Sequence, residues 1–223
     1  LTHGLAPSVG IFMAFFGGCV AGLCTTLIYT KLKVPDLLAG ILMMTMLYSI
    51  NLRIMSNRAN ISFLRIPTTF SRIISFTETK FPDIPSETGI LIFLIIFILI
   101  FKLLLDLFFH TDLGLTMGAL GSNQQMVISQ GVNPQIVRGI GVCVGDGLAA
   151  LSGAFASMYN GFADVGSGTG IIVSGLASLM IGEFIIRSNK ITWITLRVLI
   201  GSIIYRALML LARRYGHYIH LTA

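Results

Sequence analysis

The chain has 223 residues, of which 55% are hydrophobic and only 11% are charged. A soluble domain would carry about a quarter charged residues, so the composition excludes an ordinary soluble enzyme and indicates a polytopic membrane protein. The net charge of +6 is modest and the sequence has no dense run of Lys or Arg, which indicates lipid headgroups or docking partners rather than nucleic acid.

Runs of about 20 apolar residues are long enough to cross a hydrocarbon core about 30 Å thick. Residues 8–30 form the first run, which ends before Lys31 and Lys33. Residues 37–52 form a shorter run that is interrupted by Asn51. This second run is either a tilted spanning helix or a partly re-entrant one.

The longest polar stretch, residues 53–88, holds several arginines and three prolines, and its apolar patches are too short to cross a bilayer. It is therefore predicted to lie along the membrane surface. The positive-inside rule would place it in the cytoplasm, but that rule is weighted towards short loops, so charge alone leaves the orientation open.

Four further apolar runs follow. The first of these four, which is the third run of the chain, is the most uniformly apolar. The fourth run of the chain is rich in glycine and alanine, which favours close packing of helices. The runs cover residues 89–109, 139–159, 171–186 and 191–212. The sequence thus predicts an all-α polytopic protein with about six membrane segments.

A moderately polar stretch, residues 113–141, lies between the third and fourth runs. Its amide side chains and the turn at 130–134 would be costly in hydrocarbon, so the stretch is predicted to be a loop at the membrane surface. Met126, Val127 and Ile128 beside glutamines predict a short amphipathic helix within it. Such a helix suits docking to a soluble partner, although an ordinary interfacial loop has the same pattern.

Local signals also predict where this short helix begins and where the next one starts. Ser122 or Asn123 can cap the start of the short helix, and Pro134 can open the helix that follows. Turns at Gly121 and at residues 131–134 are expected to bound it.

The cysteines and histidines indicate no metal site and no disulfide. Cys19, Cys24 and Cys143 lie in apolar runs without a CxxC pair, which predicts buried apolar side chains. The four histidines are scattered and lack a metal-binding spacing. Leu1 is not Met and no signal region precedes the first run, so we expect both ends of the natural chain to be missing.

Several motifs resemble the coupling region and neighbouring segments of ATP-binding cassette (ABC) importer permeases of the branched-chain amino acid and ribose type. They are GLTMGALGSN at 114–123, QGVN at 130–133, LAALSGA at 148–154, YNGFADVGSG at 159–168 and GLASLMIGE at 175–183. Residues 31–45 and 48–55 add a similarity to the tryptophan/tyrosine-type branch. Family members usually have a basic residue where this chain has Met117, so a cationic contact at that position has no support.

The resemblance implies a type II-like importer transmembrane domain over residues 1–223, in a bacterial cytoplasmic membrane. It implies a homodimer of permeases, two cytoplasmic ATPase subunits that bind ATP and Mg, and an extracytoplasmic binding protein. It places residues 110–138 in the cytoplasm as a coupling loop and residues 53–88 on the outer face. No nucleotide-binding motif occurs in this chain, so no bound cofactor and no enzyme activity are expected, and an aromatic amino acid is the expected substrate.

The coupling segment would insert into a groove on the ATPase, where a short helix can transmit a rigid push. Its candidate residues are Gly118, Gly121, Asn123, Gln124, Val127, Gly131, Val132 and Asn133. The binding protein would dock through carboxylates onto arginines of the outer loop, because the guanidinium fork matches a carboxylate. These arginines, Arg53, Arg58, Arg65 and Arg72, could equally extend to lipid phosphates.

A third set of residues is predicted to lie near the translocation path, although packing and a tight outer connection are the alternatives. The set is Met43, Tyr48, Asp146, Asn160, Asp164, Gly166 and Gly168. Asp146 lies within an apolar run, where it could line a water-filled path, pair with Arg138 or be protonated. Glu183 is expected to pair with Arg187 at i+4. The alternative function is an ion-gradient-driven secondary transporter or channel, for which Asp146 and Glu183 give only a sparse relay.

Overall fold

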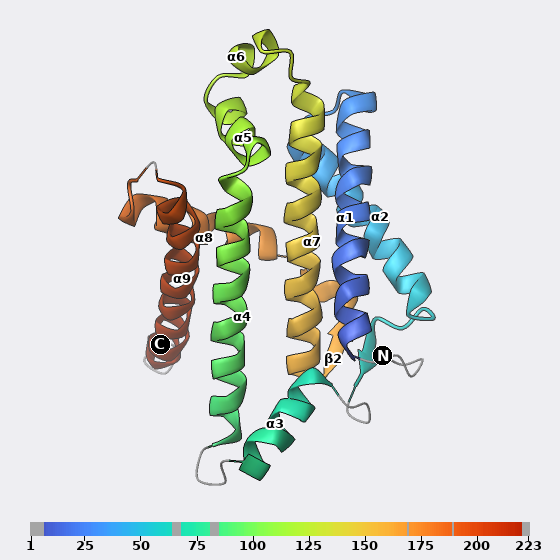
Figure 1. The fold of residues 1–223 in the computed structure, drawn as a ribbon. Coiled ribbons are helices and arrows are strands. Elements are labelled where there is room, and N and C mark those ends of the chain that lie inside the picture. Colours follow the sequence, from blue (N-terminus) through green and yellow to red (C-terminus); the bar gives the residue numbers. More distant parts are fainter. Residues whose placement is uncertain (1–6, 64–67, 81–84, 169, 189, 220–223) are drawn as a thin grey trace. The chain divides into compact units, whose positions relative to one another are not determined.

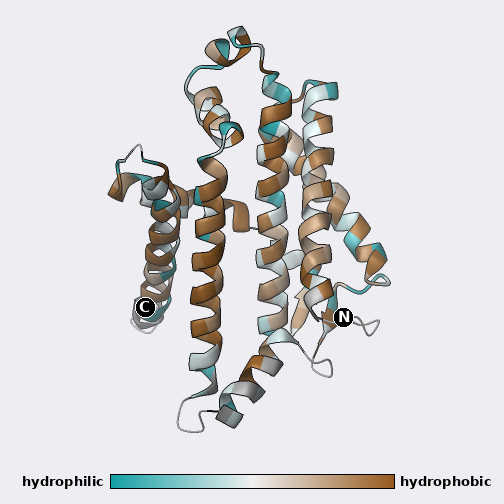
Figure 2. Cartoon of the chain, viewed as in Figure 1, coloured by the Kyte–Doolittle hydropathy of each residue, from teal (hydrophilic) through white to brown (hydrophobic). Residues whose placement is uncertain are grey.

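The computed structural model describes residues 7–63, 68–80, 85–168, 170–188 and 190–219, and these residues are almost entirely helical (Figure 1). Six segments among them are long and apolar enough to cross a membrane, which confirms the predicted all-α polytopic class. The spans are Val9–Leu32, Asp36–Ile54, Glu87–Phe109, Pro134–Asn160, Val165–Ile185 and Ile191–Tyr215. Figure 2 shows α4 (Ser86–Phe109) as hydrophobic along nearly all of its length.

The described residues form two compact units. The first contains Leu1–Phe97 and Leu113–Gly166, and the second contains Ile98–Asp112 and Ser167–Ala223. α4 therefore contributes its first half to one unit and its second half to the other. That residues 1–223 act as a single permease domain stays a prediction.

In the first unit, α1 (Pro7–Leu32) and α7 (Pro134–Asn160) run side by side (Figure 1). Glycines allow their backbones to approach, because a Cβ atom at Gly22 would lie 2.7 Å from the Cα atom of Cys143. A Cβ atom at Gly139 would lie 2.9 Å from the Cγ2 atom of Thr26. The glycine-rich composition of α7 thus produces the close packing that its sequence predicts.

α2 (Asp36–Ile54) is a continuous helix of 19 residues and is long enough to span. Of the two alternatives for this run, a spanning helix and a partly re-entrant one, the structure therefore favours the spanning helix. The interruption at Asn51 falls in the last turn of this helix, where a polar side chain is close to the helix end.

The stretch between α2 and α4 contains regular structure that its sequence did not reveal. A short strand, β1 (Asn60–Ser62), pairs antiparallel with β2 (Phe162–Asp164), with Asn60 opposite Asp164. The all-α class therefore includes a two-stranded ribbon. Strands of three residues are too short for an alternating apolar pattern to stand out.

The same stretch contains α3 (Thr69–Lys80), which contributes Phe70 to an aromatic cluster in the first unit. The ring centroid of Phe155, on α7, lies 6.1 Å from that of Phe70 and 4.5 Å from that of Phe97, on α4. These aromatic contacts attach α3 to α7, and burial of such large side chains contributes strongly to packing.

In the second unit, α8 (Ile171–Ile185) packs along α9 (Ile191–Ile219). A short 3-10 helix, η1 (Val165–Gly168), precedes α8. A Cβ atom at Gly201 would lie 2.8 Å from the Cα atom of Gly182, so small residues allow this helix pair to approach closely as well.

Candidate functional site

The predicted coupling loop folds as two short helices, α5 (Asp112–Ser122) and α6 (Gln124–Ser129), before α7 begins. Asn123 separates them and caps α6, because its Oδ1 atom accepts a hydrogen bond from the N–H of Met126 at 3.2 Å. Asn133 caps α7 in the same way by accepting from the N–H of Gln135 at 2.9 Å, with Pro134 at the first helical position. The structure therefore confirms the predicted short helix and both of its flanking signals.

One boundary differs from the prediction. Gly121 lies in the last turn of α5 rather than in a turn of its own, and the break between the helices comes at Asn123. At the other end, Gly131 has a φ of 80°, and its N–H donates to the carbonyl oxygen of Ile128 at 2.9 Å. The left-handed conformation favours glycine and ends α6 sharply.

The two faces of α6 differ in exposure. Val127 is 1% exposed and anchors the helix, whereas Met126 is 55% exposed and Ile128 is 50% exposed. Gln124 and Gln125 are exposed as well. An isolated helix of six residues is unstable in water, so the burial of Val127 and the caps must hold it in place. α6 is thus a fixed projection that offers apolar and amide groups to a partner.

A cluster of polar side chains centred on Arg138 lies near the start of α7. Arg138, in the second turn of α7, donates a hydrogen bond to the Tyr29 hydroxyl of α1, and its guanidinium lies 5.0 Å from the centre of the Tyr29 ring. Its Nη1 atom is 3.9 Å from the Oδ2 atom of Asp36, the first residue of α2. Arg138 therefore joins α1, α2 and α7, and it borders a cavity of about 320 Å³ that Met117 and Gly121 also line.

One of the three alternatives for Asp146, a pair with Arg138, is excluded. The two residues are eight positions apart on α7, or about 12 Å along the helix axis, which is too far for direct contact. Arg138 instead extends sideways to the neighbouring helices. Among the described residues, no basic side chain forms an ion pair with Asp146, which is partly buried in the middle of α7.

We expect variants of the Arg138 cluster to lower stability in a defined order. Arg138→Gln should cost about 2 kcal/mol, because it removes both a charged hydrogen bond and the cation–π contact. Tyr29→Phe should cost about 1 kcal/mol, since the ring remains. Asp36→Asn should change little, because the Asp36 side chain is 68% exposed. Thermal unfolding of the full chain in detergent measures the order, and equal effects of all three variants would contradict it.

A second polar cluster, in the second unit, was missed by the sequence interpretation. Lys102 and Asp106, on α4, form an ion pair with side chains only 16% and 12% exposed. The Thr195 hydroxyl, on α9, donates to the Oδ1 atom of Asp106 at 2.5 Å. The i, i+4 spacing of opposite charges within an apolar span was the available signal, because charges at such depth are expected to be paired.

Glu183 pairs with Arg197 of α9 at 3.7 Å, and the predicted pair with Arg187 is wrong. α8 ends at Ile185, so Arg187 lies beyond the helix and the i, i+4 geometry does not extend to it. The Nε atom of Arg197 is buried without a hydrogen-bond partner among the described residues.

The four predicted docking arginines are only partly described. Arg53 is exposed in the last turn of α2, and Arg58 is exposed just before β1. Arg65 lies outside the described residues, and Arg72 lies in α3 with a side chain that is not described. The ribbon places the backbone after Arg58 beside β2, because the N–H of Val165 donates to the carbonyl oxygen of Ala59 at 3.1 Å. Their docking role stays a prediction.

The predicted path residues are spread over several elements. Met43 is buried and Tyr48 is exposed on α2, while Asn160 ends α7. The Oδ1 atom of Asp164 accepts from the N–H of Gly166 at 3.0 Å, which holds the turn after β2.

Gly168 lies in η1, within the second unit. None of the seven path residues lines the cavity that Arg138 borders, and their role near the path stays a prediction. Among the described residues, no group of three or more His, Cys, Asp or Glu side chains could hold a metal ion.

Comparison with known proteins extends over nearly the whole chain. A family described as the permease component of branched-chain amino acid transport systems matches residues 1–219. The tyrosine transport system permease protein of Clostridioides difficile is 38% identical over 216 residues, which are 97% of this chain and 68% of that protein. An uncharacterized protein of Rickettsia prowazekii is 32% identical over 179 residues, which are 80% of this chain and 59% of that protein. No solved structure matches.

These matches confirm the resemblance to ABC importer permeases and its tryptophan/tyrosine-type branch. With the six apolar spans, they also confirm a multi-pass protein of the bacterial cytoplasmic membrane. The family is one of permease components, which are not themselves enzymes. The chain belongs to the permease-component family of branched-chain amino acid transport systems.

Proposed function

We propose that this chain is the transmembrane permease subunit of an ATP-driven importer that moves an amino acid across the membrane by alternating access. One observation carries the proposal beyond the family. α6 is a capped, projecting helix with Met126 and Ile128 exposed, and it is followed directly by α7. Such a projection suits insertion into a groove on a soluble ATPase.

The packing of α7 supports a mechanical role for this projection. A push on α6 passes through residues 130–133 to the capped first turn of α7. α7 packs against α1 at glycines on both helices, so the pair is expected to move as one body. Arg138 adds α2 to this body near its coupling end. ATP-driven movement of α6 would then shift a bundle rather than a single helix.

The partners follow from this mechanism. We propose two copies of this permease, two cytoplasmic ATPase subunits that bind ATP and Mg, and an extracytoplasmic binding protein. Residues 110–138 would then face the cytoplasm, and residues 53–88 would face the binding protein. The tyrosine permease relative favours an aromatic amino acid as the substrate.

A second candidate is transport driven by an ion gradient without an ATPase. It is favoured by Asp146, a partly buried carboxylate within a membrane span. Asp146 forms no ion pair with a described residue. Asp146→Asn should abolish uptake driven by a proton or sodium gradient if this candidate is correct. Uptake that needs ATP and survives Asp146→Asn would exclude it.

The coupling assignment is tested in liposomes that contain the full complex, with ATP hydrolysis and substrate uptake measured together. Gly131→Val places a branched side chain at a φ of 80°, which L residues rarely adopt, and should displace the end of α6. We expect the number of substrate molecules moved per ATP to fall about tenfold while hydrolysis continues.

The matched control is Gly145→Ala in α7, where a Cβ atom would meet nothing within 4 Å. This control should transport as the unchanged protein does. Unaltered coupling in Gly131→Val would reject α6 as the coupling helix, and loss of both activities in the control would show that the assay reports general instability.

A further inference from the structure

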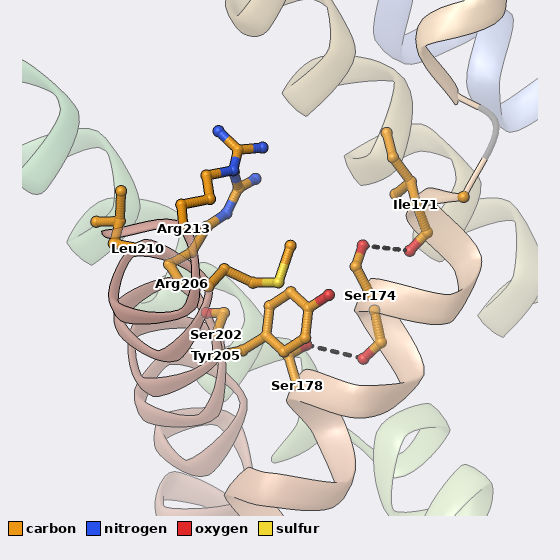
Figure 3. A pocket seen from close by; sticks show the side chains of 11 residues that line it. Ile171, Ser174, Ser178, Ser202, Tyr205, Arg206, Leu210 and Arg213 are labelled. Carbon is orange, nitrogen blue, oxygen red and sulfur yellow. Dashed lines mark hydrogen bonds between the residues drawn. The ribbon is translucent and has the colours of Figure 1, made fainter. Parts of the chain in front are cut away.

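A cavity of about 550 Å³ lies between α8 and α9, entirely within the second unit. Its volume falls in the range of about 300–1,000 Å³ that is typical of small-molecule sites. Figure 3 shows Arg206 and Arg213 extending in the same direction from α9, while Ser174 and Ser178 lie on α8. The transport mechanism proposed above uses none of these residues.

The described charged side chains that line the cavity are all positive. None of its described lining residues is acidic, whereas Arg206 and Arg213 are both cationic. Among the described residues, no carboxylate forms an ion pair with either arginine. Both arginines belong to the apolar span Ile191–Tyr215, where a cation is costly without a counter-charge. The cavity therefore suits an anion.

The hydroxyl groups add a second requirement. Ser174 donates to the carbonyl oxygen of Ile171 at 2.9 Å, and Ser178 donates to that of Gly175 at 2.8 Å. Ser202 similarly donates to the carbonyl oxygen of Leu199 at 2.9 Å. Their protons are thus in use and their oxygen lone pairs remain as acceptors. A ligand that combines an anion with hydroxyl donors would match both kinds of group.

Apart from the Tyr205 hydroxyl, the remaining wall is apolar, with contributions from Ile171, Met209 and Leu210. All three side chains are exposed in this chain. A free phosphate ion would leave this wall without a partner, whereas a lipid can cover it with its acyl chains. Basic pockets between transmembrane helices are known to suit phospholipid headgroups.

We propose that the cavity between α8 and α9 binds the headgroup of an anionic phospholipid of the phosphatidylglycerol type. The phosphate lies against the guanidinium groups of Arg206 and Arg213, which supply charge-assisted hydrogen bonds. The glycerol hydroxyls donate to the serine oxygens, and the acyl chains pack on the apolar wall. This site does not depend on the ATPase or on the transported substrate.

The test is lipid binding to the full chain in detergent, measured by native mass spectrometry during titration with phosphatidylglycerol. Phosphatidylcholine with the same acyl chains is the comparison lipid. We expect Arg206→Gln with Arg213→Gln to weaken phosphatidylglycerol binding about thirtyfold, and to leave phosphatidylcholine binding unchanged. Lys31→Gln with Lys33→Gln removes the same charge from exposed positions outside the cavity and should have little effect.

Ser174→Phe provides an independent variant, because it fills the cavity and keeps both arginines. It should also weaken phosphatidylglycerol binding, and thermal unfolding checks that each variant is folded. Equal losses in the arginine pair and in the lysine pair would indicate a general surface charge and overturn the proposal. Displacement of the lipid by inorganic phosphate or by tyrosine at similar concentrations would overturn it too, by assigning the cavity to a free anion or to an amino acid.

Discussion

Replacement of Lys102 with methionine is expected to destabilise the protein by about 3–5 kcal/mol, because it leaves a buried carboxylate without its counter-charge. The Asp106 side chain is only 12% exposed and belongs to an apolar span. Thr195 would still donate one hydrogen bond to it. A single neutral donor does not replace the ion pair, so the unfolding temperature in detergent should fall markedly.

Two further variants separate the ion pair from simple packing. Lys102→Met together with Asp106→Leu removes both charges and should be nearly neutral, since an apolar pair of similar volume avoids the cost of burying ions. Thr195→Val should cost about 1.5–3 kcal/mol, because it removes one hydrogen bond to a charged group. The loss of stability is therefore expected to be smallest for the double variant, larger for Thr195→Val and largest for Lys102→Met. A Lys102→Met protein as stable as the double variant would mean that solvent reaches Asp106 in the assembled protein.

The cluster of Lys102, Asp106 and Thr195 also joins α4 to α9 near the end of α4. Asp106 lies one turn before the end of α4, and α5 begins at Asp112. The hydrogen bond from Thr195 attaches α9 to this part of α4 within the second unit. Loss of the ion pair is therefore expected to loosen the contact between α4 and α9, as well as to lower overall stability.

The membrane spans could be predicted from the sequence because a long apolar run needs no partner to be recognised. The starts of α6 and α7 could be predicted as well, since the Asn123 cap and Pro134 at the first helical position act on backbone groups within a few residues. Local physics determines both features. The ends of the spans differ from the predicted ends by six residues at most.

Partners between distant elements could not be predicted in the same way. The pairing of β1 with β2 joins segments about 100 residues apart, and three residues give no periodic pattern. Glu183 was predicted to pair with Arg187 on its own helix, and Asp146 on the same helix was one candidate partner of Arg138, but Arg138 and Glu183 both use a neighbouring helix. A side chain long enough to reach sideways makes sequence spacing a poor guide to its partner. The predicted path residues lie on several elements, and their grouping along a path stays a prediction.

Replacement of Gly22 with leucine is expected to destabilise the protein by about 3 kcal/mol and to separate α1 from α7. A Cβ atom at Gly22 would lie 2.7 Å from the Cα atom of Cys143, and backbone on both sides cannot yield without moving a whole helix. Gly17→Leu is the matched control, because a Cβ atom at that position of α1 meets nothing within 4 Å. The control should match or slightly exceed the unchanged protein, since leucine favours a helix over glycine.

The same pair of variants tests whether α1 and α7 act as one body in transport. In liposomes with the full complex, Gly22→Leu should move fewer substrate molecules per ATP, because a push on α6 would no longer carry α1 along with α7. Gly17→Leu should leave this ratio unchanged. If Gly22→Leu folds with reduced stability and still transports with the normal ratio, α7 alone transmits the movement and the rigid-pair mechanism fails. Equal unfolding temperatures for the two variants would instead contradict the close approach of the two backbones.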